Sequence, residues 1–306
     1  EYPYLKESNE LPDQEEFGHI MRNVGAMSLH KLATVIVRNT DSLLMSSFVG
    51  LLSVGYYSNY RLVLSGISNL VQKFSNAFAG SLGNLGAMED EKRVYSIYRE
   101  LDLIYFFIYS YWTAGLISLF NAFITLCFGP QYCFSIVTVC IIVLEFYISG
   151  QRQVNLMFRE AKGLFWYDRY KAIVEAAINL TVSLALVQRF GVAGILGGTV
   201  ISSVCTCVWV EPYILMRYGI RENWQEKLKD YFVKYIQRLG IVVGLTTVTC
   251  GWVHFFPAES VFSFLLDGVI YTAFYGGVMY ALFHKSMEFQ MLRGRVLGIV
   301  KRKKSA

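Results

Sequence analysis

Two apolar segments near the start of the chain carry charged side chains at helical spacing. In the first, Arg38 and Asp41 are three residues apart, so they share a helix face and can pair. In the second, Arg61 and Lys73 belong to one polar stripe. Guanidinium and ammonium groups bind phosphates, so these cations are candidates for holding an anionic headgroup. The stripe consists of Arg61, Ser65, Asn69, Lys73, Asn76, Gly80 and Gly83.

A charged side chain inside a membrane span costs at least about 2.5–3.5 kcal/mol to insert, so it seldom faces lipid. The stripe therefore faces either another helix or water. Helix packing suits Asn69 and Asn76, because small and amide side chains allow close approach and hydrogen bonding. A hydrated cavity for an anionic, sugar-bearing substrate better accounts for the cations. The substrate-cavity candidates are Arg38, Arg61, Asn69, Lys73 and Asn76.

Two acids in the apolar segments are candidates for binding a coupling ion, H⁺ or Na⁺. Asp41 lies on the same face as Arg38, and Glu145 lies near the middle of a later segment. A carboxylate at this depth either takes up a proton or cation, or neutralises a basic neighbour. For Glu145 both interpretations remain open.

Glu175 and Glu211 lie nearer the ends of their apolar segments. At that depth a carboxylate is more simply explained by an ion pair than by a transport role. We expect these acids to pair with bases close in the sequence, namely Arg169, Lys171 or Arg217.

The run 191–199 is rich in glycine and other small residues. No strand precedes it, so it does not fit a nucleotide-binding loop. Small residues at the start of an apolar segment instead predict close packing between helices.

Long apolar runs determine the expected fold class. The chain has 306 residues, of which 54% are apolar and 17% charged, whereas soluble domains carry about 25% charged residues. Runs of about 20 apolar residues match the hydrocarbon thickness of a bilayer. We therefore predict an all-α, polytopic helical membrane protein. The expected spans are 24–49, 56–84, 103–128, 132–157, 171–189, 192–216, 234–255 and 260–284.

Basic residues are concentrated in alternate loops. With these crossings, the charged loops 86–100, 158–170 and 217–231 lie on one side, together with both ends of the chain. Cytoplasmic loops carry such an excess of Lys and Arg, so this side is predicted to be cytoplasmic. The net charge of +5 is then explained by anionic lipid headgroups rather than by nucleic acid.

Catalytic and metal-binding patterns are not found in the sequence. The six cysteines form no CxxC pair, and the four histidines are scattered, so neither a zinc site nor another cofactor is expected. No phosphate-binding loop or Ser/His/Asp set is recognisable. We therefore expect a transporter without cofactors rather than an enzyme. Because the first residue is Glu1, we also expect a piece of a longer protein.

Several short motifs in order resemble those of Wzx-type polysaccharide flippases. The likeness covers most of residues 1–215 and weakens toward the C-terminal end. The motifs are Tyr2-Pro3-Tyr4-Leu5-Lys6, Arg38-Asn39-Thr40-Asp41, Val54-Gly55-Tyr56-Tyr57-Ser58-Asn59-Tyr60, Ser81-Leu82-Gly83-Asn84, Phe158-Arg159-Glu160-Ala161-Lys162-Gly163-Leu164-Phe165, Asp168-Arg169-Tyr170, Glu175-Ala176-Ala177-Ile178-Asn179-Leu180, Gly197-Gly198-Thr199 and Trp209-Val210-Glu211-Pro212.

The resemblance implies the multidrug/oligosaccharidyl-lipid/polysaccharide exporter superfamily, in which two six-helix lobes enclose a basic central cavity. This chain would supply the second lobe and two additional C-terminal helices, and an N-terminal lobe would be missing. Transport by alternating access needs both repeats. The implied divisions are a cytoplasmic inter-lobe segment 1–23, the lobe 24–216, a cytoplasmic loop 217–233, the two further helices 234–284 and a basic cytoplasmic tail 285–306.

The resemblance also implies a function in a bacterial plasma membrane, where such proteins flip lipid-linked oligosaccharides for surface polysaccharides such as lipopolysaccharide or capsule. The expected partners are a polyprenyl-pyrophosphate-linked oligosaccharide, membrane lipids and H⁺ or Na⁺. One alternative is a cation-coupled drug antiporter of the same superfamily, which would have an acidic cavity. A membrane-embedded glycan polymerase or ligase is another, although the predicted outer loops are very short. An assembly subunit is a third, but it does not explain the basic stripe.

Overall fold

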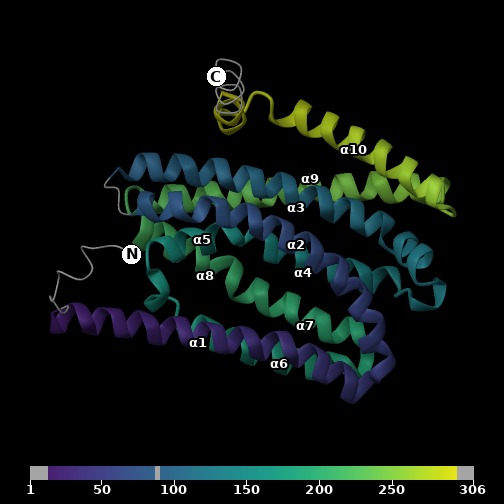
Figure 1. Ribbon diagram of the computed structural model, residues 1–306, viewed down its shortest axis with the longest axis horizontal. Helices are drawn as coiled ribbons and strands as arrows, with labels where there is room; N and C mark the ends of the chain where they lie inside the picture. Colours follow the sequence, from purple (N-terminus) through teal and green to yellow (C-terminus); the bar gives the residue numbers. More distant parts are fainter. Residues whose placement is uncertain (1–12, 87–89, 295–306) are drawn as a thin grey trace, which may run out of the picture.

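The computed structural model describes residues 13–86 and 90–294, and every regular element in these two ranges is helical. Successive long helices run in alternating directions, so the molecule is an elongated bundle (Figure 1). The predicted all-α fold is confirmed. The first motif of the resemblance, residues 2–6, lies outside the described residues, and the segments 1–23 and 285–306 are described only in part.

The first two helices are joined by a sharp turn at a glycine. Helix α1 (Gln14–Leu44) continues into a π turn, Met45–Val49, and α2 (Leu51–Gly86) begins directly after Gly50. Gly50 has φ 118°, a conformation that a residue with a side chain rarely adopts. From this turn α1 and α2 diverge toward the opposite end of the bundle (Figure 1).

The third helix, α3 (Glu91–Cys127), lies centrally, and many of its side chains are buried. The Asp90 side chain caps its first turn by accepting hydrogen bonds from backbone N–H groups. A short 3₁₀ turn, Pro130–Tyr132, leads to α4 (Ile136–Gln151). A break at the next residue separates α4 from α5 (Gln153–Ala161), so the fourth predicted span is an interrupted helix.

The fifth and sixth predicted spans form a tight hairpin. Helix α6 (Lys171–Phe190) ends at Gly191, whose φ of 53° reverses the chain. The return is interrupted after α7 (Val192–Cys205) and resumes as α8 (Cys207–Ile214). A π turn, Leu215–Ile220, completes this run.

The last two long helices cover the side of the bundle formed by α3. Helix α9 (Trp224–Phe255) packs along α3, and α10 (Val261–Phe283) also contacts α3. Ser260 and Ser263 form a reciprocal capping box at the start of α10. Helix α9 begins at Trp224, so much of the predicted loop 217–233 is helical. The charged residues of this segment lie on an extension of the apolar helix.

Five helical runs are long and apolar enough to cross a membrane, so the chain is a multi-pass membrane protein. The remaining predicted spans stay predictions, because α1 and α2 carry many polar residues and α4 has only 16 residues. The ends of α2 and α5 and the start of α9 lie at one end of the bundle, as the distribution of basic loops requires (Figure 1). The five runs are Glu91–Cys127, Lys171–Phe190, Val192–Ile220, Trp224–Phe255 and Val261–Phe283.

Close packing of α6 against α7 depends on glycines, as the sequence predicts. A Cβ atom built at Gly194 would lie 2.5 Å from the Leu186 carbonyl oxygen. A Cβ at Gly198 would collide with the Ser183 hydroxyl and approach the Ser183 backbone nitrogen to 2.8 Å. At Gly197 the nearest atom would be 4.0 Å away. The adjacent Gly197 and Gly198 therefore differ sharply in the space that they leave for a side chain.

We expect Gly198→Ala to destabilise the protein by about 1–3 kcal/mol, because an added methyl group overpacks the contact between α6 and α7. Thermal unfolding in detergent measures the effect. Gly197→Ala is the matched control, and it should leave stability unchanged or slightly raised, since alanine favours the helix. Equal stability of the two variants would contradict close packing at Gly198.

Candidate functional site

The polar face of α2 (Arg61, Asn69, Lys73 and Asn76) is exposed along its whole described length. The opposite face of the helix is apolar and buried against the bundle through Tyr60, Leu64, Ile67 and Val71. Gln72 donates a hydrogen bond to the Asn76 side chain over 3.0 Å, a contact within the helix. No helix in the described part of the chain therefore packs on this polar face.

The helices next to α2 restrict what its polar face can be in contact with. Helix α2 packs on α3 and α5, and α3 is long and apolar enough to cross a membrane. A cation exposed beside the apolar part of α3 cannot face lipid without a large cost in free energy. For an α2 that crosses the membrane beside α3, Arg61 and Lys73 therefore require water or another protein surface.

One predicted cavity residue is placed only by its backbone. Arg38 lies in α1, three residues before Asp41, but its side chain lies outside the described part of the structure. Gly80 and Gly83, the last positions of the predicted stripe, are likewise placed only by their backbone.

Asp41, by contrast, is part of a buried polar cluster. Its carboxylate is 6% exposed and accepts a hydrogen bond from the Thr199 hydroxyl, at 3.0 and 3.1 Å from its two oxygens. The Asn179 amide nitrogen in turn donates to the Thr199 hydroxyl over 2.8 Å. The Asn179 amide oxygen is buried and has no hydrogen-bond partner among the residues that the structure describes. A chain of side chains from α6 and α7 thus fixes the acid of α1.

The two predicted coupling acids are close enough to interact electrostatically. Asp41 interacts electrostatically with Glu145 of α4 and with Arg61 of α2. Tyr57 interacts with all three groups, and the Arg61 guanidinium lies 5.7 Å from its ring centre. The Asp41 cluster therefore joins five helices, and Arg61 connects it to the polar face of α2. Its members are Asp41, Tyr57, Arg61, Glu145, Asn179 and Thr199.

Sequence reasoning missed Asn179 and Thr199 as members of this cluster. Both stand in motifs of the resemblance, and Asn179 is one helical turn after Glu175, but neither residue is charged. The only signal for each of them in the sequence is a polar residue inside an apolar run. Such a signal does not identify the partner on another helix.

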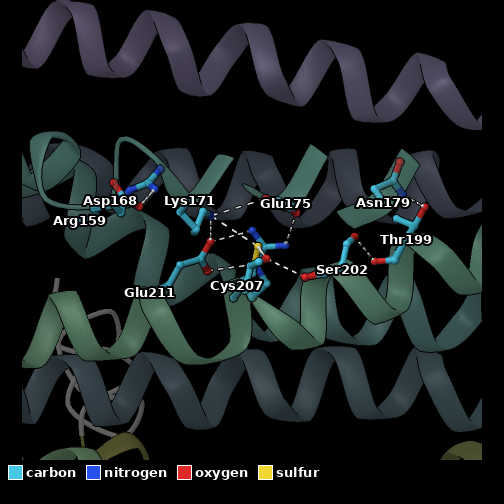
Figure 2. A network of polar contacts seen from close by, with 11 residues as sticks. Arg159, Asp168, Lys171, Glu175, Asn179, Thr199, Ser202, Cys207 and Glu211 are labelled. Atoms are coloured by element: carbon cyan, nitrogen blue, oxygen red, sulfur yellow. Dashed lines mark hydrogen bonds and ion pairs between the residues drawn. The ribbon is translucent and has the colours of Figure 1, made fainter. Parts of the chain in front are cut away.

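A second cluster is formed by ion pairs around the buried carboxylate of Glu211 (Figure 2). Arg152 binds both oxygens of Glu211, at 3.0 Å from Nε and 2.7 Å from Nη2. The Lys171 ammonium lies 2.5 Å from Glu211 and 3.5 Å from the Cys207 sulfur. Glu175 is farther away, at 3.8 Å from Arg152 and 3.9 Å from Lys171. The Glu211 cluster comprises Arg152, Lys171, Glu175, Cys207 and Glu211.

Lys171 is confirmed as a partner of both acids, but the other two predicted bases have different contacts. Arg169 lies over the Trp166 ring, 3.9 Å from its centre, and Arg217 hydrogen-bonds the Tyr213 hydroxyl. The partner that the sequence did not predict is Arg152, which lies at the break between α4 and α5. The two cations and two anions of the cluster balance, so it carries no net charge.

The chemistry available to the Asp41 cluster is that of oxygen ligands. Carboxylate, amide and hydroxyl oxygens suit Na⁺ or a shared proton, rather than a transition metal. In residues 13–86 and 90–294, no group of three or more His, Cys, Asp and Glu side chains could hold a metal ion. No family model, curated protein or solved structure matches the chain significantly.

Proposed function

We propose that this chain is part of a transporter that flips an anionic lipid-linked oligosaccharide across a bacterial plasma membrane. The observation that carries the proposal is the exposed polar face of α2, with Arg61 and Lys73 on a helix whose other face is buried. These cations can hold the phosphates of a polyprenyl-pyrophosphate carrier, while Asn69 and Asn76 can hydrogen-bond sugar hydroxyls. A single surface then meets both parts of the headgroup.

The Asp41 cluster supplies a means of coupling in this proposal. Its carboxylates bind H⁺ or Na⁺, and Arg61 belongs to both the cluster and the polar face. Binding of a cation beside Asp41 changes the charge that Arg61 faces, and therefore changes the affinity of the polar face for an anion. Coupling of this kind needs two conformations that the ion and the substrate favour differently.

The topology completes the proposal. The end of the bundle that carries the basic loops would face the cytoplasm, as the excess of Lys and Arg indicates. A second lobe would face α2, since transport by alternating access uses two repeats. The proposed partners are the lipid-linked oligosaccharide, bilayer lipids and the missing lobe.

A second candidate is a cation-coupled antiporter of small cationic molecules. It is favoured by the pairing of Asp41 with Glu145, since two neighbouring carboxylates attract a cation. In that case the substrate would bind at the acids and the polar face of α2 would be dispensable. The following substitutions separate the two functions.

We expect Arg61→Ala and Lys73→Ala, made in the intact protein, each to reduce surface glycan at least about tenfold. A charge-assisted hydrogen bond contributes about 1.5–3 kcal/mol, and about 1.4 kcal/mol corresponds to a factor of ten. The amount of protein in the membrane should stay normal, because both side chains are exposed in this structure. Extracted surface glycan and a membrane immunoblot give the two readings.

Two controls accompany this experiment. Leu70→Ala removes an exposed apolar side chain of the same helix and should leave glycan unchanged. Lys73→Arg keeps the positive charge and should retain most of the transport. Normal glycan in the Arg61→Ala/Lys73→Ala double variant would refute the role of the polar face and leave the antiporter as the better assignment.

A further inference from the structure

An aromatic turn between α5 and α6 lies away from both clusters described above. It contains a 3₁₀ helix, Leu164–Trp166, and it ends directly before Lys171–Phe190, one of the runs long and apolar enough to cross a membrane. Trp166, Tyr167 and Tyr170 of this turn are all exposed. Exposed tryptophan and tyrosine at the end of an apolar helix are typical of the boundary between hydrocarbon and headgroups. The turn is therefore expected at a membrane–water interface.

Two arginines from different parts of the chain lie beside the same indole ring of this turn. The guanidinium carbon of Arg169 is 3.9 Å from the centre of the Trp166 ring and 4.5 Å from the centre of the Tyr170 ring. Arg22 belongs to α1, which packs on the turn, and its guanidinium carbon is 5.7 Å from the centre of the Trp166 ring. Both charges therefore act at one place, within the roughly 10 Å over which salt leaves charges unscreened.

These two arginines are not neutralised by neighbouring acids. Among the residues that the structure describes, no carboxylate forms an ion pair with Arg22 or Arg169. Asp168, the acid next to Arg169, is buried and bound to Arg159 over 2.5 Å. Arg169 donates a hydrogen bond to the Trp166 carbonyl oxygen over 2.7 Å. Because a guanidinium has five N–H donors and stacking on a ring uses none of them, most of these donors remain available to an anion.

Exposed apolar side chains continue along α1 and α6 from the level of the two arginines. A molecule with its negative charge at this level can therefore place an apolar part along the same two helices. These side chains are Leu32, Val35 and Ile36 on α1 and Ile173, Val174 and Leu180 on α6.

We propose that Arg22, Trp166 and Arg169 form a binding site for the headgroup of an anionic phospholipid. The two guanidinium groups hold the phosphate, the indole ring keeps them in place, and the acyl chains lie along α1 and α6. A zwitterionic lipid binds less well, because its ammonium group is repelled by the two cations. The three residues lie outside the polar face of α2 and the Asp41 cluster, so the site does not depend on the proposed transport function.

Native mass spectrometry of the purified, detergent-solubilised protein measures its affinity for added lipid. Dioleoylphosphatidylglycerol is the anionic probe, and it should bind at least about fivefold more tightly than zwitterionic dioleoylphosphatidylcholine. Arg22→Gln and Arg169→Gln should each lower the affinity for the anionic lipid about fivefold, since one basic residue at an anionic lipid surface accounts for about that factor. Their affinity for the zwitterionic lipid should change little.

The controls separate this site from total charge, from soluble phosphates and from misfolding. Arg189→Gln removes the same charge from an exposed arginine at the opposite end of α6 and should leave the affinity unchanged. Glycerol 3-phosphate carries the phosphate without acyl chains and should not displace the lipid at equal concentration. Thermal unfolding should be normal in Arg22→Gln, because that side chain is exposed. If Arg169→Gln lowers the unfolding midpoint, Arg22→Gln alone serves as the test.

Equal affinity of the wild type for the two lipids would overturn the proposal. An equal loss of affinity in Arg189→Gln and Arg22→Gln would overturn it as well, because binding would then follow the total charge. Displacement of the lipid by glycerol 3-phosphate would exclude a lipid site and indicate a soluble phosphate compound as the ligand.

Discussion

Replacing Glu211 with Gln will lower the free energy of unfolding by about 3–5 kcal/mol, which is the cost of removing one partner from a buried ion pair. Glu211 is 2% exposed and is the nearest carboxylate to both Arg152 and Lys171. Without its charge, the buried Lys171 and the partly buried Arg152 share one more distant acid. Unfolding by SDS in mixed micelles measures the change.

The control is the second acid of the same cluster. The Glu175 carboxylate lies 3.8 Å from Arg152 and 3.9 Å from Lys171, and its side chain is partly exposed. Glu175→Gln should therefore cost at most about 1 kcal/mol, since looser and more hydrated pairs contribute little. A comparable loss in the two variants would show that Glu211 does not anchor the cluster.

The second large effect is expected at Asp41. Under the proposed function, Asp41→Asn in the intact protein reconstituted in vesicles should lower transport driven by an H⁺ or Na⁺ gradient about 10–100-fold. Asparagine keeps the shape and one acceptor, but it loses the charge that attracts a cation, and charge-assisted contacts contribute about 1.5–3 kcal/mol. Transport measured with each gradient in turn also identifies the coupling ion.

Thr199→Val is the companion variant for this test. It removes the hydroxyl that donates to Asp41 but leaves the carboxylate in place. Its apparent affinity for H⁺ should rise at least about tenfold, because the lost hydrogen bond favours the ionised carboxylate, while the maximal rate is retained. Gradient-driven transport that persists in Asp41→Asn would exclude Asp41 as the coupling residue.

The helices were predictable because their signals are local. Apolar length predicts where each long helix lies, and Gly191 marks the turn between α6 and α7 correctly because a positive φ is accessible to glycine. The ends were predicted less well. Helix α9 begins at Trp224 instead of near residue 234, since charged residues continue a helix outside the apolar region without interrupting it.

The pairings between helices were predictable only in part. Lys171 and Glu175 are four residues apart, so helical spacing brings them together. The bond between Arg152 and Glu211 joins residues 59 positions apart, and no local pattern reveals it. The same holds for Asp41 and Thr199, which are 158 positions apart. Tertiary packing selects such partners, and a single sequence does not record which helix faces which.

The breaks inside the fourth and sixth spans were not predicted either. Residue 152 separates α4 from α5, and Thr206 separates α7 from α8, without a proline at either break. Arg152 and Cys207, at or next to these breaks, both belong to the Glu211 cluster. The two interruptions thus lie side by side in the bundle, and the polar groups beside them meet in the Glu211 cluster.

Because α2 is long and joined to α1 only by the turn at Gly50, a small rotation at this turn moves its far end by a large distance. Its 36 residues extend about 54 Å at 1.5 Å per residue. A rotation of 10° at the fulcrum would therefore displace the far end by about 9 Å, while residues beside the turn hardly move. Asp41 and Arg61 lie near the fulcrum, whereas Asn76 lies well out along the arm. A torsional change at Gly50 that also releases the apolar contacts of α2 with α3 and α5 would therefore open a wide space beside the cations.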